Sequence, residues 1–228
     1  MPRQLILDLP VRPARGRAAF FVAPANEIAV AQIEDWRAWP GGKLVLIGPE
    51  GSGKTHLAHV WTELTGAPVV PAAGLAQADL PALAETGAVA VEDADRIGGD
   101  RTAETALFHL HNLLAASGGA LLVSARDPAR DWGLGLPDLA SRMQAAATAH
   151  LDPPDDVLLA AVLVKLFADR QLAVKPDLIG YLVDRMERSF AAAAETVAAI
   201  DREALATGHR PGLRLARTVL DKTLPEAR

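Results

Sequence analysis

GPEGSGKT, residues 48–55, fits the pattern G-x-x-x-x-G-K-[ST] of a phosphate-binding loop. The apolar run KLVLI (43–47) precedes it and a helical pattern follows it, which is the context that such a loop requires. Gly48, Gly51 and Gly53 allow the backbone to curl, so that its N–H groups converge on phosphate oxygens. Lys54 then reaches the terminal phosphates, and Thr55 offers a hydroxyl to Mg²⁺.

Short apolar runs recur on both sides of this loop and predict a sheet. They are continuous rather than alternating, and helical segments separate them, at 43–47, 68–70, 88–93, 120–125 and 148–151. Continuous apolar strands are typical of a parallel sheet that is covered on both faces. We therefore predict an α/β fold with three layers in the order αβα.

The pattern also predicts helices at both ends of the chain. The run 27–39 predicts a helix with Asn26 as its cap and an inward face made of Ile28, Ala31, Ile33, Trp36 and Trp39. After Asp152-Pro-Pro the pattern predicts no strand and three helical segments, namely 155–171, 176–207 with a break near Arg188, and 212–223. The expected organisation is a flexible N-terminal peptide and linker (1–19), an α/β domain (20–152) and a small all-helical domain (153–228).

Composition narrows the class of protein. Half of the 228 residues are apolar, which is enough to build a core, and there is no cysteine, so disulfides and thiolate chemistry are excluded. The net charge of −5 gives no general support for binding nucleic acid or a membrane surface. Because no apolar run is long enough to span a bilayer and no signal peptide begins the chain, we expect a cytoplasmic protein with no membrane contact.

Two acids end one predicted strand, in VAVEDAD (89–95). A phosphate-loop protein needs carboxylates on a neighbouring strand to hold Mg²⁺ through water and to orient the attacking water. By position, Glu92 is the metal-side acid and Asp93 is the water-side acid. Asp is shorter than the Glu that is more familiar at the second position, so we expect slow hydrolysis or none.

Three polar residues are further candidates for phosphate contact. Ser124 ends the strand ALLVS, where side chains face the ligand crevice of a parallel sheet, although a loop-capping Ser is the alternative. Arg142 lies on a short helix, from which it points at a neighbour's nucleotide or pairs with Asp138 on its own surface. Arg188 lies early in the long C-terminal helix, where it either reaches the phosphates or belongs to a solvated face.

These stretches together resemble one family. FFVAPANEIA, GPEGSGKTHLAH, VAVEDADRIGGD, LLVSARDPARDW and GLPDLASRM occur in the order found in the AAA+ ATPase module of the bacterial replication initiator DnaA. The chain is most similar to the Hda regulators within this DnaA-related family, through GLGLPDLASRM, IGGD and DRMERSF. The resemblance covers about 20–224 and implies an AAA+ fold with a helical lid over the nucleotide.

The resemblance also implies a set of site residues. Ser124 falls at the sensor 1 position, Arg142 at the arginine finger and Arg188 at sensor 2. The residues that bind ADP or ATP with Mg²⁺ then include Val22, Pro24 and Asn26 beside the adenine, and Gly48, Glu50, Gly51, Ser52, Gly53, Lys54, Thr55 and His56 in and after the loop.

The function that the resemblance implies is regulatory. An Hda-like protein docks beside the ATP-bound initiator DnaA, and Arg142 stimulates that protein's ATP hydrolysis in trans. DnaA carries a C-terminal DNA-reading domain for which this sequence leaves no room, so sequence-specific DNA binding is not expected, whereas self-association is compatible with the family. The alternatives are a DnaA-like initiator paralogue or helicase loader acting on DNA, and a phosphate-loop kinase for a small substrate.

The peptide QLILDL (4–9) precedes the Pro- and Arg-rich stretch PVRPARGR. Its alternation is compatible with an edge strand, but the following linker gives it no fixed register. Hda proteins begin with a similar peptide that binds the sliding clamp, the β subunit of DNA polymerase III. The resemblance therefore implies that Gln4, Leu5, Leu7 and Leu9 bind the clamp, with the apolar side chains in a pocket of the clamp.

Overall fold

The structure is a computed structural model that describes residues 12–13 and 21–223. The predicted clamp peptide (4–9) lies outside these residues, as does most of the predicted linker. The described residues form two compact units that divide between Asp152 and Pro153, and each unit has its own apolar core. None of the helices in the described part of the chain combines the length and the apolar character that crossing a lipid bilayer requires.

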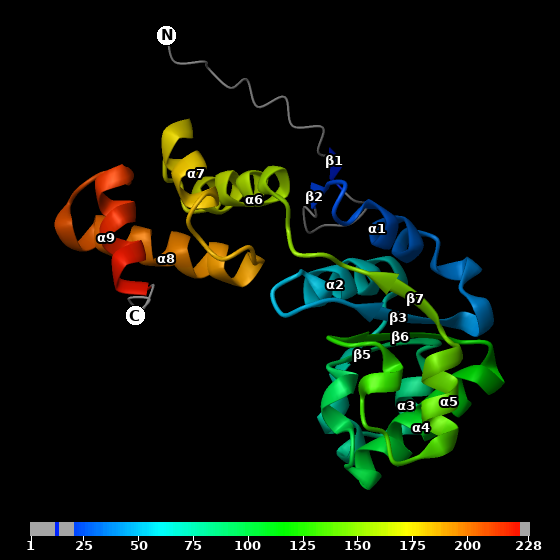
Figure 1. The fold of residues 1–228 in the computed structure, drawn as a ribbon. Helices are drawn as coiled ribbons and strands as arrows, with labels where there is room; N and C mark the ends of the chain where they lie inside the picture. Colours follow the sequence, from blue (N-terminus) through cyan, green and yellow to red (C-terminus); the bar gives the residue numbers. More distant parts are fainter. Residues whose placement is uncertain (1–11, 14–20, 224–228) are drawn as a thin grey trace. The chain divides into compact units, whose positions relative to one another are not determined.

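The first unit is built around a parallel sheet of five strands in the order β4–β5–β6–β3–β7 (Figure 1). The strands are β3 (Lys43–Ile47), β4 (Val69–Pro71), β5 (Ala88–Glu92), β6 (Ala120–Ala125) and β7 (Ala147–His150). Two short strands come before them, β1 (Arg12–Pro13) and β2 (Phe21–Val22). The register pairs Ile47 with Ala125 and with His150, so the carboxyl ends of the three strands lie at the same edge of the sheet.

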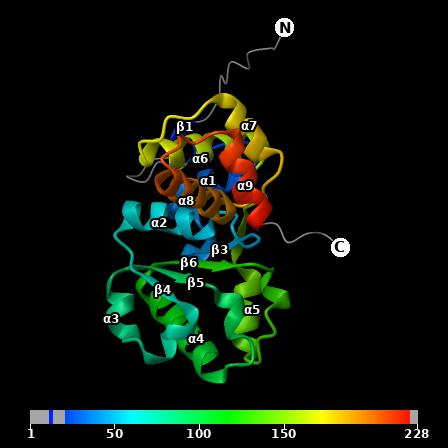
Figure 2. The same ribbon diagram turned by 90° about the vertical axis from the view of Figure 1, so that its left-hand side faces the viewer.

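Helices cover both faces of this sheet (Figure 2). One layer holds α1 (Glu27–Glu34) and α2 (Lys54–Thr65), and the other holds α3 (Leu80–Glu85), α4 (Arg101–Ser117) and α5 (Pro137–Ala145). Along β3, Leu44 and Leu46 pack with the first layer, whereas Val45 and Ile47 pack with the second. Because both faces are buried, each strand is a continuous apolar run, and the predicted three-layer α/β fold is confirmed.

The first helix is shorter than predicted. α1 ends at Glu34 instead of continuing to Trp39, and a 3₁₀ turn begins at Trp36. The rings of Trp36 and Trp39 lie 6.3 and 5.3 Å from that of Trp61 in α2. The indole N–H of Trp39 also donates a hydrogen bond to the carbonyl of Gln32 (2.7 Å). Tertiary packing of these rings therefore overrides the helical periodicity that the sequence showed.

The buried face of α1 also differs from prediction. Ile28 was predicted to point inward but is 70% exposed, and Ala31 is exposed as well. Ala29, Val30 and Ile33 are buried instead, in the core that α1 shares with α2 and the sheet. The apolar residues of this helix allow two inward faces, and its tertiary neighbours select one. Further 3₁₀ turns in this unit are Pro40–Gly42, Ala72–Gln77, Ala94–Ile97 and Ala129–Asp131.

The second unit contains four helices among the residues that the structure describes. They are α6 (Asp156–Asp169), α7 (Pro176–Val183), α8 (Phe190–Thr207) and α9 (Leu213–Thr223), packed around a core that includes Phe167 and Val197. The segment 176–207 was predicted with a break near Arg188, and Arg188 lies in the connection between α7 and α8. The hydroxyl of Ser189 accepts a hydrogen bond from Ala192 N–H (3.0 Å) and so caps a new helix after this connection.

Candidate nucleotide-binding site

The loop 48–53 joins the carboxyl end of β3 to the start of α2. Gly51 and Gly53 have φ angles of 75° and 95°, in the region that glycine adopts without steric cost. A Cβ at Gly48 would lie 2.5 Å from the carbonyl oxygen of Leu151, so no larger residue fits there. The loop therefore has the backbone freedom and the adjacent helix N-terminus that a phosphate-binding loop needs.

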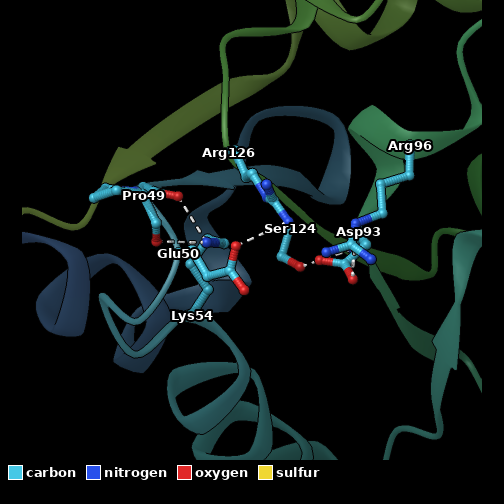
Figure 3. A network of polar contacts seen from close by, with 8 residues as sticks. Pro49, Glu50, Lys54, Asp93, Arg96, Ser124 and Arg126 are labelled. Carbon is cyan, nitrogen blue, oxygen red and sulfur yellow. Dashed lines mark hydrogen bonds and ion pairs between the residues drawn. The ribbon is translucent and has the colours of Figure 1, made fainter. Parts of the chain in front are cut away.

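Lys54 is the first residue of α2, and its ammonium contacts the start of this loop (Figure 3). Its ammonium donates hydrogen bonds to the carbonyls of Gly48 (2.6 Å) and Pro49 (2.9 Å). Burial lowers the pKa of Lys54, and the carboxylates of Asp93 and Asp95 oppose that effect. The positive charge of Lys54 therefore interacts electrostatically with two of the acids that follow β5.

Two carboxylates at or just after the end of β5 each have a buried oxygen without a hydrogen-bond partner. They are Oε1 of Glu92, the last residue of β5, and Oδ1 of Asp95. A buried polar atom without a partner is costly, and such atoms at the edge of a phosphate loop fit a hydrated cation. Asp95 is the last residue of the motif VAVEDAD, and the sequence analysis predicted no role for it. The sequence feature that could have indicated Asp95 is its place as the third acid in the run that ends this strand.

Asp93 adopts a backbone conformation that few non-glycine residues adopt, with φ of 57°. Its N–H donates a hydrogen bond to the hydroxyl of Ser124 in β6 (3.3 Å). Its Oδ2 lies 3.5 Å from Nε of Arg96, in an ion pair that is about half exposed and therefore weak. The backbone of Asp93 is thus held by the buried Ser124, and its carboxylate is held by Arg96 (Figure 3).

Arg126 is a second residue that the sequence analysis missed. It follows β6, two residues after Ser124, and its guanidinium lies 3.1 Å from a carboxylate oxygen of Glu50 in the loop. The positive charge of Arg126 contributes to lowering the pKa of Lys54, after burial. The sequence feature that could have indicated Arg126 is a basic residue at the end of the strand that also carries Ser124.

The remaining loop residues differ in exposure. Ser52 is buried, and its hydroxyl has no hydrogen-bond partner. Thr55 and His56 are exposed in the first turn of α2. The Thr55 hydroxyl is therefore accessible to a cation, as its proposed role requires.

The three residues expected beside the adenine lie just before or at the start of α1. Val22 is buried in the core that it shares with α2, whereas Pro24 is exposed. The side chain of Asn26 does not cap α1, contrary to prediction. Its Oδ1 accepts a hydrogen bond from Ala23 N–H (2.9 Å) and its Nδ2 donates one to the Phe21 carbonyl (2.8 Å), so it orders the preceding turn instead.

Arg142 does not join this cluster. Arg142 lies in the last turn of α5 and lines a pocket with Lys43, the first residue of β3. The phosphate loop follows Ile47 at the other end of that strand, roughly 13 Å further along at about 3.3 Å per residue. Arg188 belongs to the second unit, where its guanidinium pairs with the carboxylate of Asp156 at the start of α6.

A metal ion at this site would need ligands beyond the protein. In the part of the chain that the structure describes, no group of three or more His, Asp or Glu side chains is arranged to hold one. Mg²⁺ is usually bound by one or two protein oxygens together with water and substrate phosphates. The Thr55 hydroxyl and the unpartnered Glu92 oxygen fit that pattern.

No protein-family model matches the chain. Its structure is similar to domain III of DnaA from Thermotoga maritima, with a TM-score of 0.77 and 19% identity over 93% of this chain and 98% of that chain. AMPPCP-bound DnaA from Aquifex aeolicus gives 0.69 and 16%, over 83% and 65%. The FIGL-1 AAA domain in complex with ADP gives 0.68 and 12%, over 96% and 87%.

The similarity covers both the sheet and the helices and identifies the fold. At these identities it does not establish what the chain binds or does. In the strand order β4–β5–β6–β3–β7, the phosphate loop follows β3, which lies between β6 and β7. The chain has the AAA+ fold, in a form similar to that of domain III of DnaA.

Proposed function

We propose that this chain binds ADP or ATP with Mg²⁺ and stimulates ATP hydrolysis by a neighbouring DnaA initiator through Arg142, as an Hda-like regulator. One observation carries the proposal: Arg142 lies beside the first residue of β3, whereas the phosphate loop follows the last. An arginine so far from its own phosphate loop is suited to a nucleotide that another protein holds. Its exposed position, without an ion pair to any described residue, supports the same role.

In the chain's own site, the glycine loop and the N-terminus of α2 bind the phosphates. Lys54 exchanges its bonds to the loop carbonyls for phosphate oxygens, which supply a charge-assisted partner. Thr55 and Glu92 hold the Mg²⁺, with Asp95 as a second acid nearby. The metal neutralises phosphate charge when it is bound. Neighbouring folds with AMPPCP and ADP support an adenine nucleotide in this role.

Intrinsic hydrolysis is expected to be slow in this arrangement. The water-side acid is Asp93, whose carboxylate pairs with Arg96 and whose main chain is tied to Ser124. To orient an attacking water, the carboxylate has to leave Arg96 while its backbone keeps an uncommon conformation. Such a site favours holding the nucleotide over turning it over, which suits a regulator.

The proposed reaction is tested with ATP-loaded DnaA in a single turnover. Addition of the chain with ADP is expected to speed release of phosphate from DnaA by orders of magnitude, as arginine fingers do. For the Lys54→Ala variant, which lacks the loop lysine, the addition of ADP is expected to make no difference to the rate. No acceleration by the wild-type chain in either nucleotide state would overturn the proposal.

The clamp interaction is a separate part of the proposal. Gln4, Leu5, Leu7 and Leu9 are proposed to bind the sliding clamp, and the linker raises the local concentration of the chain near DNA-bound initiator. A pull-down with immobilised clamp compares the wild type with a chain that lacks residues 4–9. Equal retention of both proteins would reject the clamp peptide and leave the Arg142 mechanism intact.

A second candidate is a DnaA-like paralogue or helicase loader that acts on DNA. The observation in its favour is the fold similarity to a DnaA bound to AMPPCP and single-stranded DNA, with a TM-score of 0.66. This reading predicts binding to single-stranded DNA that weakens steeply with salt. Fluorescence anisotropy at two salt concentrations separates it from the regulator, for which we expect no tight binding.

A further inference from the structure

A polar pocket of about 510 Å³ lies in the first unit near the amino-terminal end of the sheet. Its polar and charged lining comes from three elements, namely β3, α4 and α5, and consists of Lys43, His111, Asp138, Ser141 and Arg142. The phosphate loop lies at the opposite end of β3, so this pocket is separate from the nucleotide site.

The cations of the pocket lack anionic partners. Neither Lys43 nor Arg142 forms an ion pair with a described residue, although Asp138 lines the same pocket. The nearest aromatic contact of Arg142 is the Phe108 ring, 5.8 Å away. Cationic groups that share a pocket without a carboxylate in contact attract an external anion.

His111 adds a third basic group to this pocket. It is only 2% exposed, and its Nδ1 pairs with the side-chain oxygen of Asn112 at 3.2 Å. No hydrogen bond joins Nε2 to any residue that the structure describes, so this nitrogen is the one left for a ligand. Because the Asn112 oxygen can only accept, Nδ1 is the protonated nitrogen, and Nε2 becomes a donor to an oxyanion when the ring takes up a second proton.

The electrostatics agree with this geometry. Burial lowers the pKa of Lys43, and the charge of Arg142 lowers it further. Burial also lowers the pKa of His111, the hydrogen bond with Asn112 opposes this, and Lys43 and Arg142 add to the lowering. The charge of Arg142 thus disfavours protonation of Lys43, both charges disfavour protonation of His111, and a bound anion would relieve that repulsion.

We propose that the Lys43–His111–Arg142 pocket binds a phosphate-class oxyanion, with Lys43 and His111 contacting the anion together with Arg142. The two sources of this chemistry are free phosphate and a phosphate of a nucleotide that a partner presents. This proposal goes beyond the arginine finger because it gives Lys43 and His111 a role in binding an anion. It also names a ligand, free phosphate, that can bind without a partner protein. Ser141 offers a hydroxyl at the same rim.

The test follows the side-chain nitrogen resonances of His111 by NMR in the full-length Lys54→Ala chain, in which the phosphate loop is disabled. Inorganic phosphate is titrated at constant ionic strength against chloride, and then ATP-loaded DnaA is added without free phosphate. Phosphate binding is expected to raise the pKa of His111, because the anion offsets the charges of Lys43 and Arg142 that lower it; Asp138 is the other charged group that lines the pocket. A response in the first arm assigns free phosphate, and a response only in the second assigns the partner's nucleotide.

Variants make the outcome decisive. Lys43→Gln is expected to weaken the response of His111 about tenfold or more, since one charge-assisted contact is lost. Arg142→Gln, at an exposed position of α5, repeats the test without touching the core, and Lys175→Gln in the second unit is the matched control. No response in either arm, or equal responses in Lys43→Gln and Lys175→Gln, would overturn the proposal. If His111 does not respond but the chain still stimulates ATP hydrolysis by DnaA, the pocket proposal fails and the proposed function stands. If His111 responds to phosphate but the chain does not stimulate DnaA, the pocket proposal stands and the proposed function fails.

Discussion

Glu104 of α4 accepts a hydrogen bond from the backbone N–H of Leu136, the residue before α5, at 2.7 Å. The same buried carboxylate accepts hydrogen bonds from Gly135 N–H (2.9 Å) and from Gly99 N–H (2.9 Å). One side chain therefore joins the start of α4 to the start of α5, the helix that carries Arg142. Glu104 therefore helps to fix the start of the helix on which Arg142 lies.

Glu104→Ala is expected to destabilise the first unit. It leaves three backbone donors without their partner, which costs about 3 kcal/mol of unfolding free energy or more. Denaturant unfolding measures the loss, and Glu104→Gln, which keeps a carbonyl oxygen, should recover part of it. The matched control is the exposed Glu85→Ala, for which we expect a change within about 0.5 kcal/mol. An equal effect of the Glu104 and Glu85 variants would contradict this role.

Acid is expected to weaken the same junction. Burial raises the pKa of Glu104, but the hydrogen bonds from Gly135, Gly99 and Leu136 lower it more, so the folded-state pKa lies below the ordinary glutamate value. The stabilisation is therefore present above the ordinary glutamate pKa and is lost as the pH falls through the lower, folded-state value. Unfolding free energies of the wild type and Glu104→Gln, measured from neutral pH into acid, should converge. A constant difference across that range would refute the linkage.

Gly48→Ala is expected to abolish nucleotide binding. The added methyl group would lie 2.5 Å from the Leu151 carbonyl and 2.7 Å from the Ser52 hydroxyl, so the loop must move. Titration with a fluorescent ADP analogue measures the affinity. Gly180→Ala in α7 is the control, because nothing lies within 4 Å of its added methyl group and alanine favours a helix. Wild-type affinity in Gly48→Ala would show that the phosphates bind elsewhere.

Glu92→Gln is expected to reduce the gain in ATP affinity that Mg²⁺ provides. The substitution keeps the shape of the side chain but removes the charge beside its unpartnered buried oxygen. ATP titrations with Mg²⁺ and with EDTA give that gain for the wild type, for Glu92→Gln and for the exposed control Glu85→Gln. If the gain is the same in all three proteins, Glu92 is not the metal-side acid.

The layered fold could be predicted because its signals are local. Each strand of the sheet is a short apolar run, and the loop 48–55 contains its own glycines and lysine, so neighbours in sequence were sufficient. The helices of the second unit followed in the same way. They include the break predicted near Arg188, after which the Ser189 cap starts a new helix.

The parts that could not be predicted depend on residues distant in sequence. Glu104 meets Gly135 and Leu136 across 31 and 32 residues, and in the sequence it is one of several charges along a helix. Asp95 and Arg126 gained significance only when the sheet brought β5 and β6 beside Lys54. Likewise, the end of α1 depends on how Trp36 and Trp39 pack against Trp61.

The position of Arg142 can be tested through its chemistry. Arg142→Lys keeps the charge but loses the planar fork of donors, so it is expected to remain defective if the guanidinium stabilises a transferring phosphoryl group. Arg130→Ala is the matched control in the same unit, because Arg130 is exposed and pairs only with its neighbour Asp131 among the described residues.

The most direct measurement is the single-turnover rate of ATP hydrolysis by DnaA in the presence of wild-type chain, Arg142→Ala, Arg142→Lys or Arg130→Ala. The account predicts that wild type and Arg130→Ala accelerate hydrolysis equally, and that both Arg142 variants lose the acceleration of about 10³-fold or more that a finger supplies. Full acceleration by Arg142→Ala, with the variant folded and bound to its partner, would contradict the central claim.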